Sequence, residues 1–162
     1  MRRIQDWLEP VQRLGDTASM REVTRSALVA RTPQLLYQLV AEVENYPQFV
    51  PGCTAARVLE RSELEMVAQL SVRRGLLNTQ FTTRNRLDPD RSVHMELVEG
   101  PFRMLEGHWS FTPVASNGCR IELVLRFEFA NALKAALFDP LFEETAGSLV
   151  RAFVVRAQSL PA

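Results

Sequence analysis

The segment of residues 46–54, with the sequence YPQFVPGCT, constrains the fold more than any other, since it separates a helical pattern from a run of strand patterns. Its two prolines, Pro47 and Pro51, prevent a continuing helix and restrict the residues before them. Three large apolar side chains nevertheless lie within it: Tyr46, Phe49 and Val50. Aromatic side chains in such a loop pack against the rim of the core or against a ligand. The sequence therefore predicts that this segment forms the mouth of a cavity.

Composition indicates one globular domain without a strong overall electrostatic field. A chain of 162 residues suits a single domain with one sizeable core, and 46% hydrophobic with 23% charged residues is ordinary for such a domain. Lys+Arg and Asp+Glu number 19 each, so binding to DNA is not expected and any RNA contact would need a local basic patch.

Cellular location is predicted from the lack of export signals. No apolar run approaches the ~20 residues of a transmembrane helix, and no signal peptide is recognised. We therefore expect a cytoplasmic protein with Cys53 and Cys119 as reduced thiols.

Residues 1–19 differ from the rest of the chain. Charges of both signs alternate there with apolar residues at rough helical spacing, which Pro10 interrupts and Gly15 ends. Met20 directly precedes the first strand pattern and could serve as a translation start. We expect residues 1–19 to be a poorly packed arm or an extension before an alternative start, and residues 20–162 to form the folded domain.

The remaining chain changes between two hydrophobic periods. A strand pattern at residues 22–30 precedes a helix start at Thr32-Pro33, where a capping hydroxyl is followed by proline. Period-two strand patterns follow at residues 54–60, 64–72, 79–87, 93–97, 105–111 and 121–129. Their one-sided alternation indicates an antiparallel sheet with one apolar and one wet face.

A long helix is expected at the C-terminal end. Asp139 can cap it, Pro140 suits the first helical position, and Glu143 and Glu144 suit its positive end. Its broad apolar face comprises Leu141, Phe142, Leu149, Val150, Phe153, Val154 and Ala157. Because a curved sheet cannot leave its apolar face wet, we expect this helix to lie across that face.

Several short motifs occur in a fixed order along the chain: YPQFVPGC at residues 46–53, FTTRN at 81–85, LVEGPF at 97–102, WSFTP at 109–113 and CRIE at 119–122. With the order of elements, they resemble START-like domains of the polyketide cyclase/dehydrase and lipid-transport superfamily. Within it, they resemble the coenzyme Q-binding and ribosome-association toxin family over about residues 21–161. The resemblance implies an α+β helix-grip fold, in which a curved antiparallel sheet of about seven strands wraps on the long C-terminal helix, with a short helix after the first strand.

The resemblance implies two alternative activities. The mitochondrial relatives imply non-catalytic binding of a hydrophobic molecule, a ubiquinone or another prenyl lipid, in a groove under the C-terminal helix, with no required cofactor. The bacterial relatives imply binding to the large ribosomal subunit and inhibition of translation initiation, with a small ubiquitin-like antitoxin as partner. A polyketide cyclase or aromatase is a minor third alternative, because fold does not fix chemistry.

The expected ligand site is an apolar slot lined by Tyr46, Phe49, Pro51, Met95, Phe102, Trp109, Phe127, Phe142, Val150 and Phe153. Ordinary core packing is the alternative explanation of such an aromatic stripe. Polar Thr79, Thr83 and Asn85 on the same sheet face favour a cavity, because buried polar groups need partners and ligand sites combine apolar walls with a few polar groups. Tyr46 and Trp109 could also hydrogen-bond a ligand carbonyl, or a backbone group instead.

A second expected site is a basic patch on neighbouring strands that could contact ribosomal RNA phosphates: Arg73, Arg74, Arg84 and Arg86. The alternative is a solvated face balanced by Glu65 and Glu96. No catalytic residue and no metal site are predicted, since His94 and His108 lie on separate strand patterns without metal-ligand spacing. The sequence also lacks a nucleophile elbow, a phosphate-binding glycine loop and a dinucleotide fingerprint.

Overall fold

A computed structural model describes residues 20–161. The expectation that residues 1–19 form a poorly packed arm falls outside the described residues.

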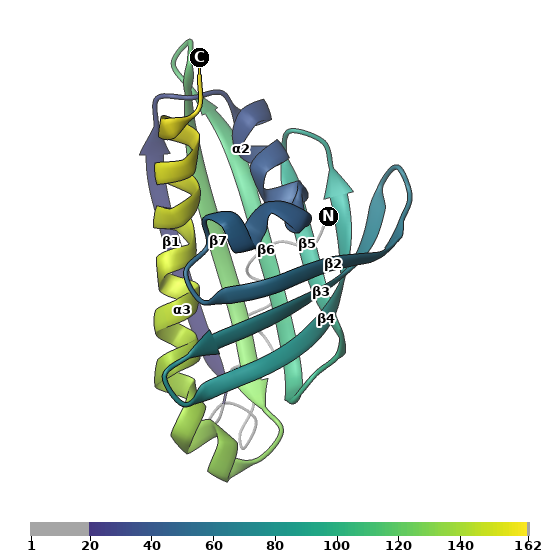
Figure 1. The fold of residues 1–162 in the computed structure, drawn as a ribbon. Helices are drawn as coiled ribbons and strands as arrows, with labels where there is room; N and C mark the ends of the chain where they lie inside the picture. Colours follow the sequence, from purple (N-terminus) through teal and green to yellow (C-terminus); the bar gives the residue numbers. More distant parts are fainter. Residues whose placement is uncertain (1–19, 162) are drawn as a thin grey trace.

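The described chain forms one antiparallel sheet and two α-helices. The elements follow in the order β1 (Arg21–Val29), α2 (Pro33–Ala41), the 3-10 helix η1 (Val43–Gln48), β2 (Cys53–Arg61), β3 (Glu65–Arg74), β4 (Leu77–Asp88), β5 (Ser92–Glu99), β6 (Phe102–Val114), β7 (Gly118–Phe129) and α3 (Ala132–Ser159). The strand order in the sheet is β1-β7-β6-β5-β4-β3-β2. Figure 1 shows the sheet curling so that β2, β3 and β4 pass in front of β5, β6 and β7, while α3 runs along the side of β1 and β7. The predicted helix-grip fold is confirmed.

The segment between α2 and β2 is helical in part, which sequence patterns did not indicate. The hydroxyl of Thr32 caps α2 as predicted by accepting from the backbone N–H of Leu35 at 3.3 Å. Pro47 then lies inside η1, in the segment expected to be a loop. A short 3-10 helix tolerates proline because few of its hydrogen bonds are affected. The backbone N–H of Phe49 still reaches the carbonyl of Tyr46 at 3.1 Å.

The start of α3 was predicted wrongly. The helix begins at Ala132, where the side chain of Asn131 accepts from the backbone N–H of Lys134 at 2.9 Å. The alanine- and leucine-rich residues 132–137 are strong helix formers, so the helix passes through Pro140 despite the missing N–H. Asp139 is therefore no cap, and its buried carboxylate Oδ2 instead accepts from Nε of Arg21 at 3.4 Å.

Two aromatic clusters hold α3 against the sheet. Phe142 packs against Phe102 and Phe127, with ring centroids 5.1 and 4.8 Å away. About three turns further along the helix, Phe153 packs against Tyr46 and Trp109, with ring centroids 5.2 and 5.1 Å away. The stretch of α3 between these two anchors spans the concave face of the sheet.

Among residues 20–161, none of the helices has the length and apolar character needed to span a membrane.

Candidate functional site

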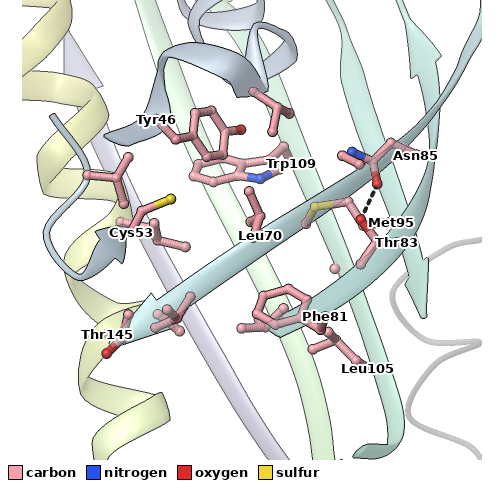
Figure 2. Close-up of a pocket in the computed structure, with 18 of the residues that line it drawn as sticks. Tyr46, Cys53, Leu70, Phe81, Thr83, Asn85, Met95, Leu105, Trp109 and Thr145 are labelled. Atoms are coloured by element: carbon pink, nitrogen blue, oxygen red, sulfur yellow. Dashed lines mark hydrogen bonds between the residues drawn. The ribbon is translucent and has the colours of Figure 1, made fainter. Parts of the chain in front are cut away.

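A cavity of about 90 Å³ lies between the two aromatic anchors, enclosed by α3, η1 and the concave face of the sheet. Its walls come from both halves of the curled sheet, since Leu70 of β3 and Phe81 of β4 face Trp109 of β6 across it (Figure 2). Alternate residues of β3, β4 and β6 line the cavity, because a strand sends every second side chain to the same face.

The structure brings together six of the ten predicted ligand-site residues. The predicted residues that line the cavity are Tyr46, Pro51, Met95, Trp109, Phe142 and Phe153. Phe102, Phe127 and Val150 are buried in the core but do not line it. Phe49 lies on the outer side of the same wall, where the guanidinium carbon of Arg156 is 5.2 Å from its ring centroid.

Two polar side chains on β4 enter this otherwise apolar cavity. The hydroxyl of Thr83 donates to Oδ1 of Asn85 at 2.7 Å, and both residues are buried. The amide nitrogen of Asn85 points away from Thr83 (Figure 2), and no described residue accepts a hydrogen bond from it. Asn85 is only 3% exposed and lines the cavity, so this donor is available to a molecule inside the cavity.

A second donor comes from the opposite wall. The indole nitrogen of Trp109 lies on the side of its ring toward Asn85 (Figure 2), and none of residues 20–161 accepts a hydrogen bond from it. Tyr46 differs, because its hydroxyl donates to the backbone carbonyl of Val40. The hydroxyl of Thr145 likewise donates to the carbonyl of Leu141 at 2.9 Å. The donors left for a ligand are therefore those of Asn85 and Trp109.

The cavity lining is poorly suited to acid–base catalysis. None of the residues that line it is a histidine, aspartate, glutamate, lysine or arginine. Its titratable groups are Tyr46 and Cys53, and burial raises the pKa of both. A general acid or base works best with a pKa near the operating pH, so neither group is tuned for proton transfer at neutral pH.

The cavity is smaller than the 300–1,000 Å³ of typical ligand sites, so a quinone-sized ligand must displace side chains. Met95 is placed to move, since its Cε occupies the space above Gly107, 2.3 Å from where a Cβ on that residue would lie. An unbranched methionine changes rotamer readily. A change of the Met95 rotamer away from Gly107 would therefore enlarge the cavity for a ligand.

The four arginines predicted to contact RNA do not form one surface, because Arg73 lies on the outer face of the sheet, six positions along β3 from the partner of Arg84, and Arg74 lies on the cavity face. Arg74 pairs with Glu144 of α3 at 2.7 Å. Arg84 and Arg86 alternate with the cavity-lining residues of β4 and therefore lie on the opposite face of the sheet. There they pair with carboxylates, Arg84 with Glu65 at 2.8 Å and Arg86 with Glu96 at 3.5 Å.

A histidine–glutamate cluster occupies the outer face of the sheet, away from the cavity. Strand register places His94 opposite His108, and Nε2 of His94 lies 3.2 Å from Glu96 and 3.3 Å from Glu106. The ligand atoms of His94, Glu96 and Glu106 lie within 4.8 Å of one another and could together hold a metal ion. Arg86 and Arg126 approach the same two carboxylates at 3.5 and 3.9 Å and already supply positive charge.

His108 has an altered pKa in this cluster. Burial, helped by the neighbouring His94, lowers the pKa of His108, and Glu106 opposes that shift. Sequence patterns do not indicate this cluster, because strand register brings its members together.

The curled antiparallel sheet, the long C-terminal helix and the apolar cavity between them define a helix-grip domain. Residues 29–154 match the family described as polyketide cyclase/dehydrase and lipid transport, and the chain belongs to that family.

Two relatives are more specific. The chain is 45% identical over 141 residues to the ribosome association toxin RatA of Escherichia coli K12, with 87% of this chain and 89% of the relative covered. It is 31% identical over 147 residues to the mitochondrial coenzyme Q-binding protein COQ10 of Drosophila melanogaster, with 87% of this chain and 61% of that protein covered.

A solved structure shares the fold. The Zhui aromatase/cyclase of a Streptomyces species superimposes with a TM-score of 0.78 at 21% identity, covering 86% of this chain and 94% of the other. At that identity the likeness concerns the fold alone.

Proposed function

We propose that this protein binds, without chemically changing it, a hydrophobic molecule that carries a hydrogen-bond acceptor: a ubiquinone or another prenyl lipid. The observation that carries the proposal is the apolar cavity under α3 with two spare donors, the amide of Asn85 and the indole of Trp109. A quinone carbonyl would accept from these donors while its ring and prenyl tail occupy the apolar space. The name of the Drosophila relative, coenzyme Q-binding protein, supports this ligand class.

The absence of an enzymatic function is part of the same proposal. A cyclase must move protons on its substrate, and the cavity lining offers only a buried tyrosine and a buried cysteine with raised pKa values. The similarity to the Zhui aromatase/cyclase therefore supports a shared scaffold and not a shared reaction.

Fluorescence titration tests the proposal directly. Trp7 and Trp109 are the tryptophans of this chain, so a Trp7→Phe background leaves Trp109 to report on the cavity. Decylubiquinone is the probe, since it has the quinone ring and a soluble tail. Replacing both polar partners, Thr83→Val with Asn85→Leu, removes the amide donor without leaving its partner unsatisfied. We expect the affinity to fall about tenfold, the cost of one ligand hydrogen bond.

A matched control lies on the other face of the sheet. Nε2 of Gln69 donates to the hydroxyl of Thr82 at 3.5 Å, so Gln69→Leu with Thr82→Val makes an equivalent change outside the cavity. This control should bind decylubiquinone as the wild type does. Unchanged binding in a folded Thr83→Val/Asn85→Leu variant would overturn the assignment of this donor, and no saturable binding in the wild type would overturn the ligand proposal itself.

We propose ribosome association as a second candidate function. The support is the 45% identity to the ribosome association toxin of Escherichia coli over nearly the whole of both chains. The partner would be the large ribosomal subunit, as the resemblance of the motifs implied. Co-sedimentation of the full chain with purified Escherichia coli large subunits at low salt tests it, and failure to co-sediment would remove this candidate.

A further inference from the structure

An open groove of about 500 Å³ lies between the η1–β2 connection and α3, on the outer side of the cavity wall. Its polar lining consists of Arg74, Arg151, Arg156, Ser148 and Ser159, and Phe49 is its aromatic member. None of its described lining residues is an aspartate or a glutamate. Since the protein as a whole carries no net charge, this groove concentrates positive charge locally.

Two of these arginines have no carboxylate partner among the described residues. Within residues 20–161, no carboxylate lies at ion-pair distance from Arg151 or Arg156, whereas Arg74 is paired with Glu144. Arg156 donates to the side-chain oxygen of Gln48 at 3.2 Å and lies over the ring of Phe49. Its Nε is buried and has no hydrogen-bond partner. Among residues 20–161, the guanidinium groups of Arg151 and Arg156 in this groove therefore have no anionic partner.

The α3 residues of the groove form one stripe. Ser148, Arg151, Val155 and Ser159 recur at spacings of three and four residues, which places them on the same side of a helix. Leu149 and Phe153, one or two positions away, line the cavity instead. One helix thus presents an apolar side to the cavity and a basic side to the groove.

We infer that this groove binds single-stranded ribosomal RNA, with phosphates on Arg151 and Arg156 and an unpaired base against Phe49. This inference rests on ribosome association as a proposed function. Guanidinium groups pair with phosphate through two parallel hydrogen bonds, and serine hydroxyls add phosphate contacts. Unpaired RNA bases stack on aromatic rings and arginine planes, which the Phe49–Arg156 pair provides.

The shape of the groove favours RNA over a membrane surface. Its volume falls within the range of sites that enclose a compact ligand, so it can admit one nucleotide from a flexible strand. A lipid headgroup layer offers charge across a flat surface, for which a recess behind Phe49 and Pro51 is poorly shaped. Binding to an anionic membrane is the competing explanation, and the test below distinguishes it from RNA binding.

Co-sedimentation with purified Escherichia coli large ribosomal subunits tests the inference, using the full chain at a series of salt concentrations from about 50 to 200 mM. The test variant is Arg151→Glu/Arg156→Glu. The control is Arg84→Glu/Arg86→Glu, which changes the net charge equally on the opposite face of the sheet. We expect the groove variant to lose at least about tenfold in affinity, and the control to bind like the wild type.

The salt dependence gives a second readout. Each phosphate contact to single-stranded nucleic acid contributes about 0.7 to the slope of log affinity against log salt, so loss of two contacts should lower the slope by about 1.4. A neutral variant, Arg151→Ala/Arg156→Gln, guards against misfolding by the introduced carboxylates and should show the same slope change. Circular dichroism melts establish that each variant is folded.

Each result decides the inference. Wild-type binding that the folded groove variants retain would overturn the groove and leave ribosome association standing. Equal losses in the groove variant and the control would also overturn it, since general charge would then explain the binding. A wild type that does not co-sediment at low salt removes the proposed function together with the groove. Binding to phosphatidylglycerol vesicles that only the groove variants lose, with ribosome binding unaffected, would assign the groove to a membrane surface instead.

Discussion

Filling the cavity is expected to stabilise the fold while removing ligand binding. Ala146 of α3 lines the cavity and is 2% exposed, so Ala146→Leu would place three added carbons in the void. At ~24 cal/mol per Å³ of void, filling about 90 Å³ stabilises the protein by at most about 2 kcal/mol. Alanine and leucine differ little in helix propensity, so the change reports on the void. In a domain of this size, about 2 kcal/mol raises the Tm by about 4–8 °C.

Ala157→Leu provides the control for this substitution. Ala157 lies on the same helix and is fully buried, but it lines neither the cavity nor the groove. The same added volume should therefore overpack the core and destabilise the protein by about 1–3 kcal/mol. Urea unfolding followed by circular dichroism measures both changes, and decylubiquinone titration of the Trp109 fluorescence measures binding.

Two results would refute the reasoning. If Ala146→Leu destabilises as much as Ala157→Leu, position 146 has no void that a side chain can fill. If Ala146→Leu is stable and still binds decylubiquinone with wild-type affinity, the ligand occupies another part of the molecule.

Three further predictions concern α3 and the cavity wall. Pro140→Ala should stabilise the protein by about 1–3 kcal/mol, because it restores a backbone N–H inside a continuous helix, and a lower Tm would show that the helix depends on the proline. Burial raises the pKa of Asp139 above 3.8 despite Arg21, so the folded state binds this proton more tightly than the unfolded state. The free energy of unfolding should therefore fall as pH rises from 3.8 through the raised pKa of Asp139. Urea melts should show a weaker pH dependence in Asp139→Asn, and an unchanged pH dependence would contradict this prediction. Decylubiquinone should slow the reaction of Cys53 with a thiol reagent but not that of Cys119, since only Cys53 lines the cavity; equal rates with and without the quinone would contradict this.

The sheet was predictable from sequence because each strand repeats the same two-residue alternation, which fixes the face of every side chain. The start of α3 was not, because two cap signals compete. Asp139-Pro140 is the more conspicuous signal in the sequence, yet Asn131 forms the cap. The residues between them are good helix formers, and their summed preference outweighs a single interior proline.

The candidate site was predictable only to the level of a face. Alternation places Phe127 and Trp109 on the concave side, but it does not tell which of them packs tightly and which borders a void. That depends on where α3 crosses the concave face of the sheet. Phe142 of α3 fills the space over Phe127, with the two ring centroids 4.8 Å apart. The ion pairs of the arginines could not be predicted for a related reason, since the partner of Arg84 is decided by the register of β3 against β4.

The residue 46–54 segment, which most constrains the fold, also separates the cavity from the arginine-lined groove. Pro51 contributes to both, and Phe49 of the groove lies 5.2 Å from Phe153 of the cavity, ring centroid to ring centroid. Tyr46 contacts both rings, at 6.2 and 5.2 Å, and its hydroxyl is anchored to the backbone of α2. A ligand that needs more space than the Met95 side chain can yield would press on this aromatic wall, because the backbone of the opposite boundary is the hydrogen-bonded sheet. The proposed ligand site and the proposed RNA site therefore border the same few side chains from opposite sides, so a change of shape in one is expected to affect the other.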